Sequence, residues 1–121
     1  MLLITSNKRK KLLNIRFIGR VALADFQNTR EDMTTELGGM SLGFRYMADF
    51  SQLESMGLDC VPEIGKIMEL IEKAGASLTV RFIPDPNKDI GMNILTAFHY
   101  SKHLKVVTCK NLVDVVKTLE L

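Results

Sequence analysis

The sequence of 121 residues contains no tryptophan, only two cysteines and only three prolines. Cys60 and Cys109 are far apart and form no CxxC pair, which excludes a small disulfide scaffold and favours reduced thiols in a cytoplasmic protein. No apolar run approaches the roughly 20 residues of a membrane-spanning helix. Polar residues 7–11 interrupt the apolar N-terminal stretch, so no secretory signal is expected.

What is present is typical of one globular domain, which we expect to span residues 1–121. Hydrophobic residues make up 46% of the chain and charged residues 25%. The formal net charge is only +2, too balanced for a dedicated nucleic-acid-binding protein. Six of the 16 basic residues precede Asp25, the first acid, and from residue 21 onward acids exceed bases by four. The positive charge is therefore concentrated near the N-terminus.

Residues 2–5 and 12–18 alternate like strands, with Leu13, Ile15 and Phe17 on one face of the second. The polar residues 6–10 between them indicate an antiparallel hairpin, whose basic tip consists of Lys8, Arg9, Lys10 and Lys11. This tip could contact nucleic acid or anionic lipid. A solvated turn that discourages edge pairing is the favoured interpretation. No aromatic residues interleave with the charges, so a base-stacking surface is not expected.

Helical spacing follows. One stripe consists of Leu23, Phe26, Met33, Leu37 and Met40. Gly38 and Gly39 should end this helix. Residues 44–49 then indicate a strand, and 51–57 a loop. Asp59 can cap a second helix, because its carboxylate can accept the free amides of the first turn, which contains Pro62 and Glu63. The apolar stripe of this helix covers 64–74, and Gly75 should end it.

Residues 77–83 alternate like a strand, and 84–88 form a turn. Asp89 can cap a third helix that carries Ile90, Ile94, Ala97 and Phe98 and ends near Tyr100 or Ser101. A short strand over 104–108 leads to a fourth helix, capped by Asn111 and ending at Leu119. The order ββαβαβαβα predicts an α/β domain with a mixed, mainly parallel sheet, an N-terminal antiparallel hairpin and about four helices.

Few groups of residues in the sequence are arranged as catalytic, metal-binding or phosphate-binding sites require. The glycine-rich residues 38–43 follow a helix, whereas a phosphate-binding loop precedes one. His99 and His103 are four residues apart, but no nearby third ligand completes a metal site. Cys60 at a helix start could be an activated thiol, yet the adjacent Asp59 would oppose this. We therefore expect no catalytic residues, no bound metal and no cofactor, and a protein that is not an enzyme.

Several elements together follow a known pattern. Asp49-Phe50-Ser51 ends one strand, residues 64–75 form a helix with a glycine stop, and 78–83 form the next strand. With a strand-glycine start at 17–21 and a final strand and helix over 104–119, this order resembles the STAS domain. STAS domains are bacterial anti-sigma-factor antagonists and related regulatory modules. The resemblance implies a STAS-like fold and a regulatory protein as partner, for example an anti-sigma-type kinase.

The family's phosphorylation motif, Asp-Ser-Ser/Thr-Gly at the start of the helix, is not matched. A gapless alignment places Asp59 at the phosphorylated serine, and a slip of three residues places Met56 there. The usual serine switch is therefore expected to be missing. Asp59 would supply a fixed negative charge instead, or would serve only as a helix cap.

We hypothesise a non-catalytic interaction module whose partner-binding and switch candidates are Ser51, Ser55, Met56, Gly57 and Asp59. Ser51 and Ser55 remain possible modification sites. The alternative function is lipophilic small-molecule binding between helices and sheet, with a cavity lined by Met33, Met40, Met68 and Met92, although packed core is the favoured role for these methionines. A homodimer could form through a strand edge or an apolar helix face, and a small enzyme has the least support.

Overall fold

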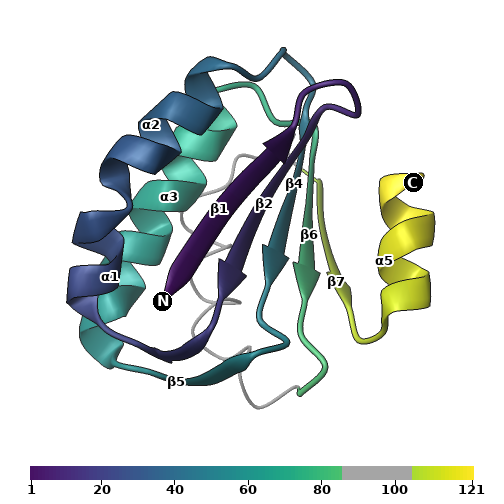
Figure 1. Ribbon diagram of the computed structural model, residues 1–121. Helices are drawn as coiled ribbons and strands as arrows, with labels where there is room; N and C mark the ends of the chain where they lie inside the picture. Colours follow the sequence, from purple (N-terminus) through teal and green to yellow (C-terminus); the bar gives the residue numbers. More distant parts are fainter. Residues whose placement is uncertain (86–104) are drawn as a thin grey trace.

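The structure, a computed structural model, describes residues 1–85 and 105–121 (Figure 1). Its strands are β1 Leu2–Asn7, β2 Leu12–Phe17, β3 Gly19–Val21, β4 Arg45–Asp49, β5 Leu53–Met56, β6 Leu78–Phe82 and β7 Lys105–Cys109. Its helices are α1 Leu23–Asn28, α2 Arg30–Gly38, α3 Val61–Lys73 and α5 Leu112–Leu119, with a short 3-10 turn η1 at Leu58–Cys60. The expected helix capped by Asp89, most of the turn before it, and His99 and His103 lie outside the described residues.

Five strands form one sheet in the order β1-β2-β4-β6-β7. Only the β1–β2 pair is antiparallel, and the other neighbours run parallel. This confirms the mixed, mainly parallel sheet with an N-terminal hairpin. Because β2, β4, β6 and β7 point the same way, their carboxyl ends lie together at one end of the sheet, and the β1–β2 hairpin turn lies at the opposite end (Figure 1).

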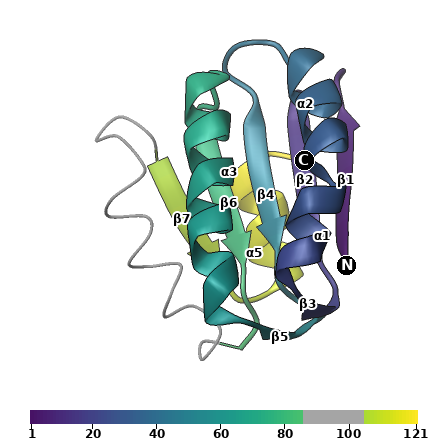
Figure 2. The ribbon, with the colours of Figure 1, turned by 90° about the vertical axis from the view of Figure 1, so that its left-hand side faces the viewer.

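Helices α1, α2 and α3 cover one face of the sheet, and α5 packs on the other face (Figure 2). The larger core lies under α1–α3 and includes the three alternating residues of β2, Leu13, Ile15 and Phe17, as their spacing predicts. Phe17 stacks on Phe50 with ring centroids 4.4 Å apart, and Phe26 of α1 completes this aromatic group at 6.4 Å from Phe17.

A smaller core joins α5 to β6 and β7 and contains Val80, Phe82, Cys109, Val115 and Leu119. The start of α5 is capped as expected, because Asn111 Oδ1 accepts a hydrogen bond from the Asp114 amide at 2.9 Å. The outward side chains Leu112 and Val113 remain exposed.

Two expectations about the first half of the chain are wrong. The single helix expected over 23–40 is two helices, because Thr29 leaves the helical path and its hydroxyl donates to the carbonyls of Asp25 and Phe26. The expected loop at 51–57 contains β5, which pairs in parallel with β3. Three- and four-residue strands carry too little alternation to be recognised, and only the fold brings these two together.

Candidate functional site

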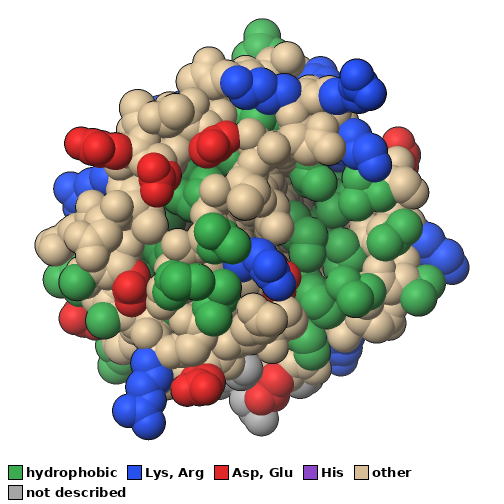
Figure 3. All heavy atoms as spheres, in the orientation of Figure 1, with side chains coloured by type: hydrophobic (Ala, Val, Ile, Leu, Met, Phe, Trp, Pro, Cys, Tyr) green, Lys and Arg blue, Asp and Glu red, His purple; other side chains and the backbone are tan. Residues whose placement is uncertain are grey.

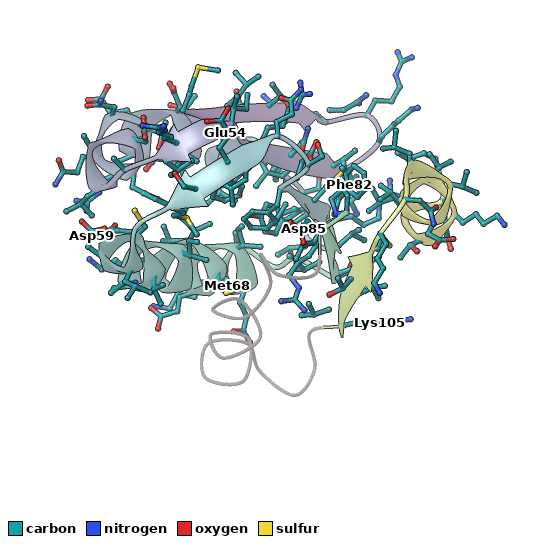
Figure 4. All side chains as sticks on the ribbon, turned by 90° about the horizontal axis from the view of Figure 1, so that it is seen from below. Glu54, Asp59, Met68, Phe82, Asp85 and Lys105 are labelled. Atoms are coloured by element: carbon teal, nitrogen blue, oxygen red, sulfur yellow. The ribbon has the colours of Figure 1, made fainter. Side chains whose placement is uncertain are left out.

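The predicted site residues gather at the carboxyl end of the sheet, where the chain leaves β4, forms β5 and η1, and enters α3. Seen from this end, Glu54 lies on β5, and Asp59 lies where η1 leads into α3 (Figure 4). Ser51, Ser55, Met56, Gly57 and Asp59 are thus placed along one continuous segment. The basic tip belongs to the other end of the sheet (Figure 1).

Ser51 is held by the last residue of β4. Asp49 Oδ1 accepts hydrogen bonds from the Ser51 amide at 2.9 Å and from the Ser51 hydroxyl at 2.6 Å. The other carboxylate oxygen of Asp49 lies 3.6 Å from Nε of Arg16, its register partner on β2. The Asp-x-Ser pattern therefore fixes the turn after β4, and the Arg16–Asp49 pair was not anticipated although both residues lie at strand ends.

Strand β5 presents two polar residues to solvent. Leu53 is buried, Met56 is partly buried, and Glu54 and Ser55 are exposed. Ser55 lies opposite Arg20 of β3 in the register of the small sheet. Pairing with β3 makes this segment an ordered part of the fold, so its exposed side chains have defined positions.

Asp59 does not cap α3, contrary to expectation. The residue before the helix is Cys60, and no side chain accepts a hydrogen bond at that position. Asp59 lies instead inside η1, where the Cys60 amide donates to the Gly57 carbonyl at 3.0 Å. The inserted 3-10 turn places the start of α3 after Asp59. The exposed Asp59 carboxylate therefore accepts no capping hydrogen bond from the first turn of α3.

Leu58 is the residue that sequence reasoning missed. Its side chain is 89% exposed, the highest value among the large hydrophobic residues of the described ranges. It sits between Gly57 and Asp59 on η1. The only sequence signal is an apolar residue that belongs to no helical or alternating pattern. Single exposed leucines are common on protein surfaces. Leu58 adjoins the exposed Ser55 and Asp59 on one ordered segment, and it is this combination that makes the segment a candidate contact for another molecule.

The thiol of Cys60 is buried beneath this turn. Burial raises the pKa of the Cys60 thiol, and the Asp59 carboxylate raises it further, by charge repulsion and by accepting a hydrogen bond from the sulfur at 3.7 Å. A backbone hydrogen bond with Gly57 acts in the opposite direction. The thiol therefore stays protonated and is poorly suited to nucleophilic catalysis.

A cleft of about 380 Å³ lies on the helical face between α2 and α3. Its apolar lining includes Phe26, Met33, Ile67 and Leu70. Glu63 lies at its rim and pairs with Arg30 at 3.4 Å and with Lys66 at 3.2 Å. The cleft is of the size that accepts a small molecule.

The four methionines proposed to line a cavity are not gathered there. Met33 lines the cleft, whereas Met68 is fully buried in the core and Met40 packs against it. Met92 lies outside the described residues. Core packing therefore accounts for Met40 and Met68.

Residues suited to holding a metal ion do not cluster in the described ranges. Within residues 1–85 and 105–121, no three His, Cys, Asp or Glu side chains are grouped so that they could hold a metal ion. No helix within the same ranges is long and apolar enough to cross a membrane. The features that remain are an exposed turn and a shallow cleft.

No protein-family profile matches the sequence, and no curated protein sequence matches it. Solved structures are similar in three dimensions. The Bacillus cell fate determinant SpoIIAA in its phosphorylated form is 18% identical with a TM-score of 0.60, over 96% of this chain and 99% of that one. An anti-sigma factor antagonist from Mycobacterium paratuberculosis is 11% identical with a TM-score of 0.62, over 100% and 94%.

An uncharacterized Shewanella loihica protein described as having a SpoIIAA-like fold is 12% identical with a TM-score of 0.70, over 98% of this chain and 92% of that one. Likeness at these identities and over nearly whole chains establishes the fold. It confirms the STAS-like, SpoIIAA-like fold that the order of the sequence elements predicts.

We expect the Cys60 thiol to make stability fall at alkaline pH. Its folded-state pKa is raised, so its contribution is complete below the thiol pKa of the unfolded chain, about 8.5, and is lost as pH rises through the folded pKa. Urea unfolding at about pH 7.5 and about pH 10 should show a smaller decline for Cys60→Ala than for the wild type. Cys109→Ala is the control and should retain the full decline. Equal declines in all three proteins would contradict the assignment.

Proposed function

We propose that this chain is a non-catalytic regulatory module that binds another protein through its β5–η1 surface. We define this surface by its exposed residues Ser51, Glu54, Ser55, Leu58 and Asp59. The observation that carries the proposal is the almost fully exposed Leu58 on an ordered turn, beside an acidic residue that makes no helix cap.

The chemistry of this surface fits a protein partner. Protein interfaces combine an apolar centre with a polar rim. Leu58 supplies the apolar part, and the exposed acids Glu54 and Asp59 supply negative charge, joined at the same end of the sheet by the exposed Asp85 (Figure 4). A partner with a small apolar pocket and basic neighbours would be complementary.

The solved structures of similar fold support one class of partner. One structure of similar fold is an anti-sigma factor antagonist. We therefore propose a bacterial regulatory partner of the anti-sigma type, including its kinases, and a cytoplasmic setting for the complex. The buried, protonated Cys60 and the absence of a metal-binding group among the described residues support binding over catalysis.

The partner can be tested by site-specific crosslinking in the host cell. Benzoylphenylalanine in place of Leu58 should give one covalent adduct, to be identified by mass spectrometry and then reconstituted with the purified partner. With that pair, Leu58→Ser and Asp59→Asn should each weaken binding about tenfold, because they remove buried apolar area and a complementary charge.

The matched control is benzoylphenylalanine at Leu112, which is also exposed, at 61%, but lies on α5. An adduct between two copies from this position would reveal the homodimer considered from the sequence. Equal adducts to the same protein from both positions, or full affinity in both single variants, would exclude the β5–η1 surface as the binding site.

We further propose that no serine switch operates on this surface. Phosphate on Ser51 would place a second anion against the Asp49 carboxylate, which lies 2.6 Å from the hydroxyl. Ser55 follows Glu54 on β5 and is the more accessible hydroxyl. Asp59 provides a permanent negative charge near the start of α3 instead.

The protein isolated from its host should therefore carry no phosphate, before or after incubation with a purified anti-sigma-type kinase and ATP. Intact-mass spectrometry measures this directly. A phosphorylated species that disappears in Ser55→Ala or in Ser51→Ala would identify a working switch and would overturn this part of the proposal.

The cleft between α2 and α3 favours a second candidate function, the binding of a small lipophilic molecule. Met33→Glu would place a charge on its apolar wall and should abolish retention of such a ligand, whereas Leu112→Glu, the control, changes an exposed apolar residue on α5 that does not line the cleft. Organic extraction of the purified protein followed by mass spectrometry should reveal the ligand. Its absence from the wild type, or equal retention in Met33→Glu, would refute this function.

A further inference from the structure

The hairpin tip and the loop between α2 and β4 form one surface at the end of the molecule away from β5. The Arg45 amide donates to the Lys11 carbonyl at 2.8 Å, and the Arg45 guanidinium donates to the Lys10 carbonyl. The side chain of Lys8 crosses Gly39, where an added Cβ would come within 2.5 Å of Lys8 Cε. These contacts bring residues distant in sequence into one basic end, which we define as Lys8, Arg9, Lys10, Lys11 and Arg45.

Few acids balance these charges. Within residues 1–85 and 105–121, none of the five cations of the basic end forms an ion pair. The nearby carboxylate of Glu36 accepts a hydrogen bond from the Ser6 hydroxyl. Lys and Arg side chains accordingly gather along the upper rim of the molecule, over the β1–β2 hairpin (Figure 3).

An exposed leucine stands beside these cations. Leu42 is 78% exposed, although the next apolar residue, Phe44, is fully buried. Its side chain lies over Gly75, where an added Cβ would come within 2.5 Å of Leu42 Cδ2. Gly75 adopts a φ of 95°, a conformation that glycine adopts without strain. The Gly43 amide donates to the Gly75 carbonyl at 2.7 Å, which fixes the loop. Leu42 therefore lies against Gly75 on one side and is exposed to solvent on the other.

We propose that the basic end docks on an anionic lipid bilayer, with Leu42 inserted among the acyl chains. Each Lys or Arg near an anionic membrane strengthens binding about fivefold, and a protruding apolar side chain adds burial that a purely electrostatic contact lacks. Nucleic acid is the less suitable occupant. It would satisfy the cations but would leave Leu42 unused, and no aromatic side chain belongs to the basic end.

Docking in this way would leave the proposed partner surface accessible. The hairpin turn and β5 lie at opposite ends of the sheet (Figure 1). A bilayer at the basic end therefore leaves Leu58 and Asp59 facing away from the membrane. Vesicle binding is independent of the proposed partner, so one proposal can fail while the other stands.

Cosedimentation with vesicles tests the proposal. The protein should bind vesicles of phosphatidylcholine containing about one third phosphatidylserine, and should not bind phosphatidylcholine alone. Replacing Lys8, Arg9 and Lys10 by alanine should weaken binding about a hundredfold. Leu42→Ser should weaken it about tenfold. Raised salt should weaken the vesicle binding of both the wild type and Leu42→Ser, because it screens the charges, but should not alter the ratio of their affinities.

Matched controls separate the site from net charge and hydrophobicity. Replacing Lys105, Lys110 and Lys117 by alanine removes the same charge near α5, and Leu112→Ser removes another exposed leucine; both variants should bind like the wild type. Equal losses in test and control variants, or binding to phosphatidylcholine alone, would overturn the proposal. Tighter binding to a short DNA duplex than to the anionic vesicles would identify nucleic acid as the occupant and would also overturn it.

Discussion

The stack of Phe17 on Phe50, with ring centroids 4.4 Å apart, is the contact on which the lower half of the molecule depends. Phe17 is the last residue of β2, and Phe50 directly follows β4, so the two rings join these strands just as they leave the main sheet. Both rings are fully buried, and Phe26 of α1 packs beside them. Since the two rings hold the ends of β2 and β4 next to each other, the segments that follow them, β3 and β5, start side by side and pair. The small sheet and the η1 turn are then carried in a fixed place.

The parallel sheet separates two kinds of surface. In the five-stranded sheet β2, β4, β6 and β7 run in one direction, so the connections between them fall at either the amino or the carboxyl end. The carboxyl end carries Leu58 and several exposed acids, and the amino end carries Leu42 and five cations. Each end thus presents one exposed leucine, with cations around it at the amino end and with acids, beside the exposed Arg20 of β3, at the carboxyl end. This arrangement is suited to two simultaneous contacts with different partners.

Groups that could have been reactive are engaged in structure. The Asp49 carboxylate fixes the turn at Ser51 and pairs with Arg16, and Glu63 is shared between Arg30 and Lys66. Cys60 is protonated and buried. Such engaged groups stabilise a defined surface, which binding requires.

Much of the fold was determined by the sequence itself, because the signals are local. The alternation of Leu13, Ile15 and Phe17, the basic turn and the Asn111 cap each depend on neighbouring residues, and each is present in the structure. The order of elements then identified a STAS-like fold, although neither its detailed site nor its partner follows from that order.

Only the tertiary structure decided where the site residues stand. Asp59 is of a residue type that commonly caps helices, yet an intervening 3-10 turn places the start of α3 beyond it. Strands β3 and β5 are too short to be stable alone, and they form because the fold brings them together to pair with each other. The exposure of Leu58 and Leu42 depends on which neighbours pack around them. Local patterns specify which residues prefer a helix or a strand, whereas burial and pairing are properties of contacts between distant segments.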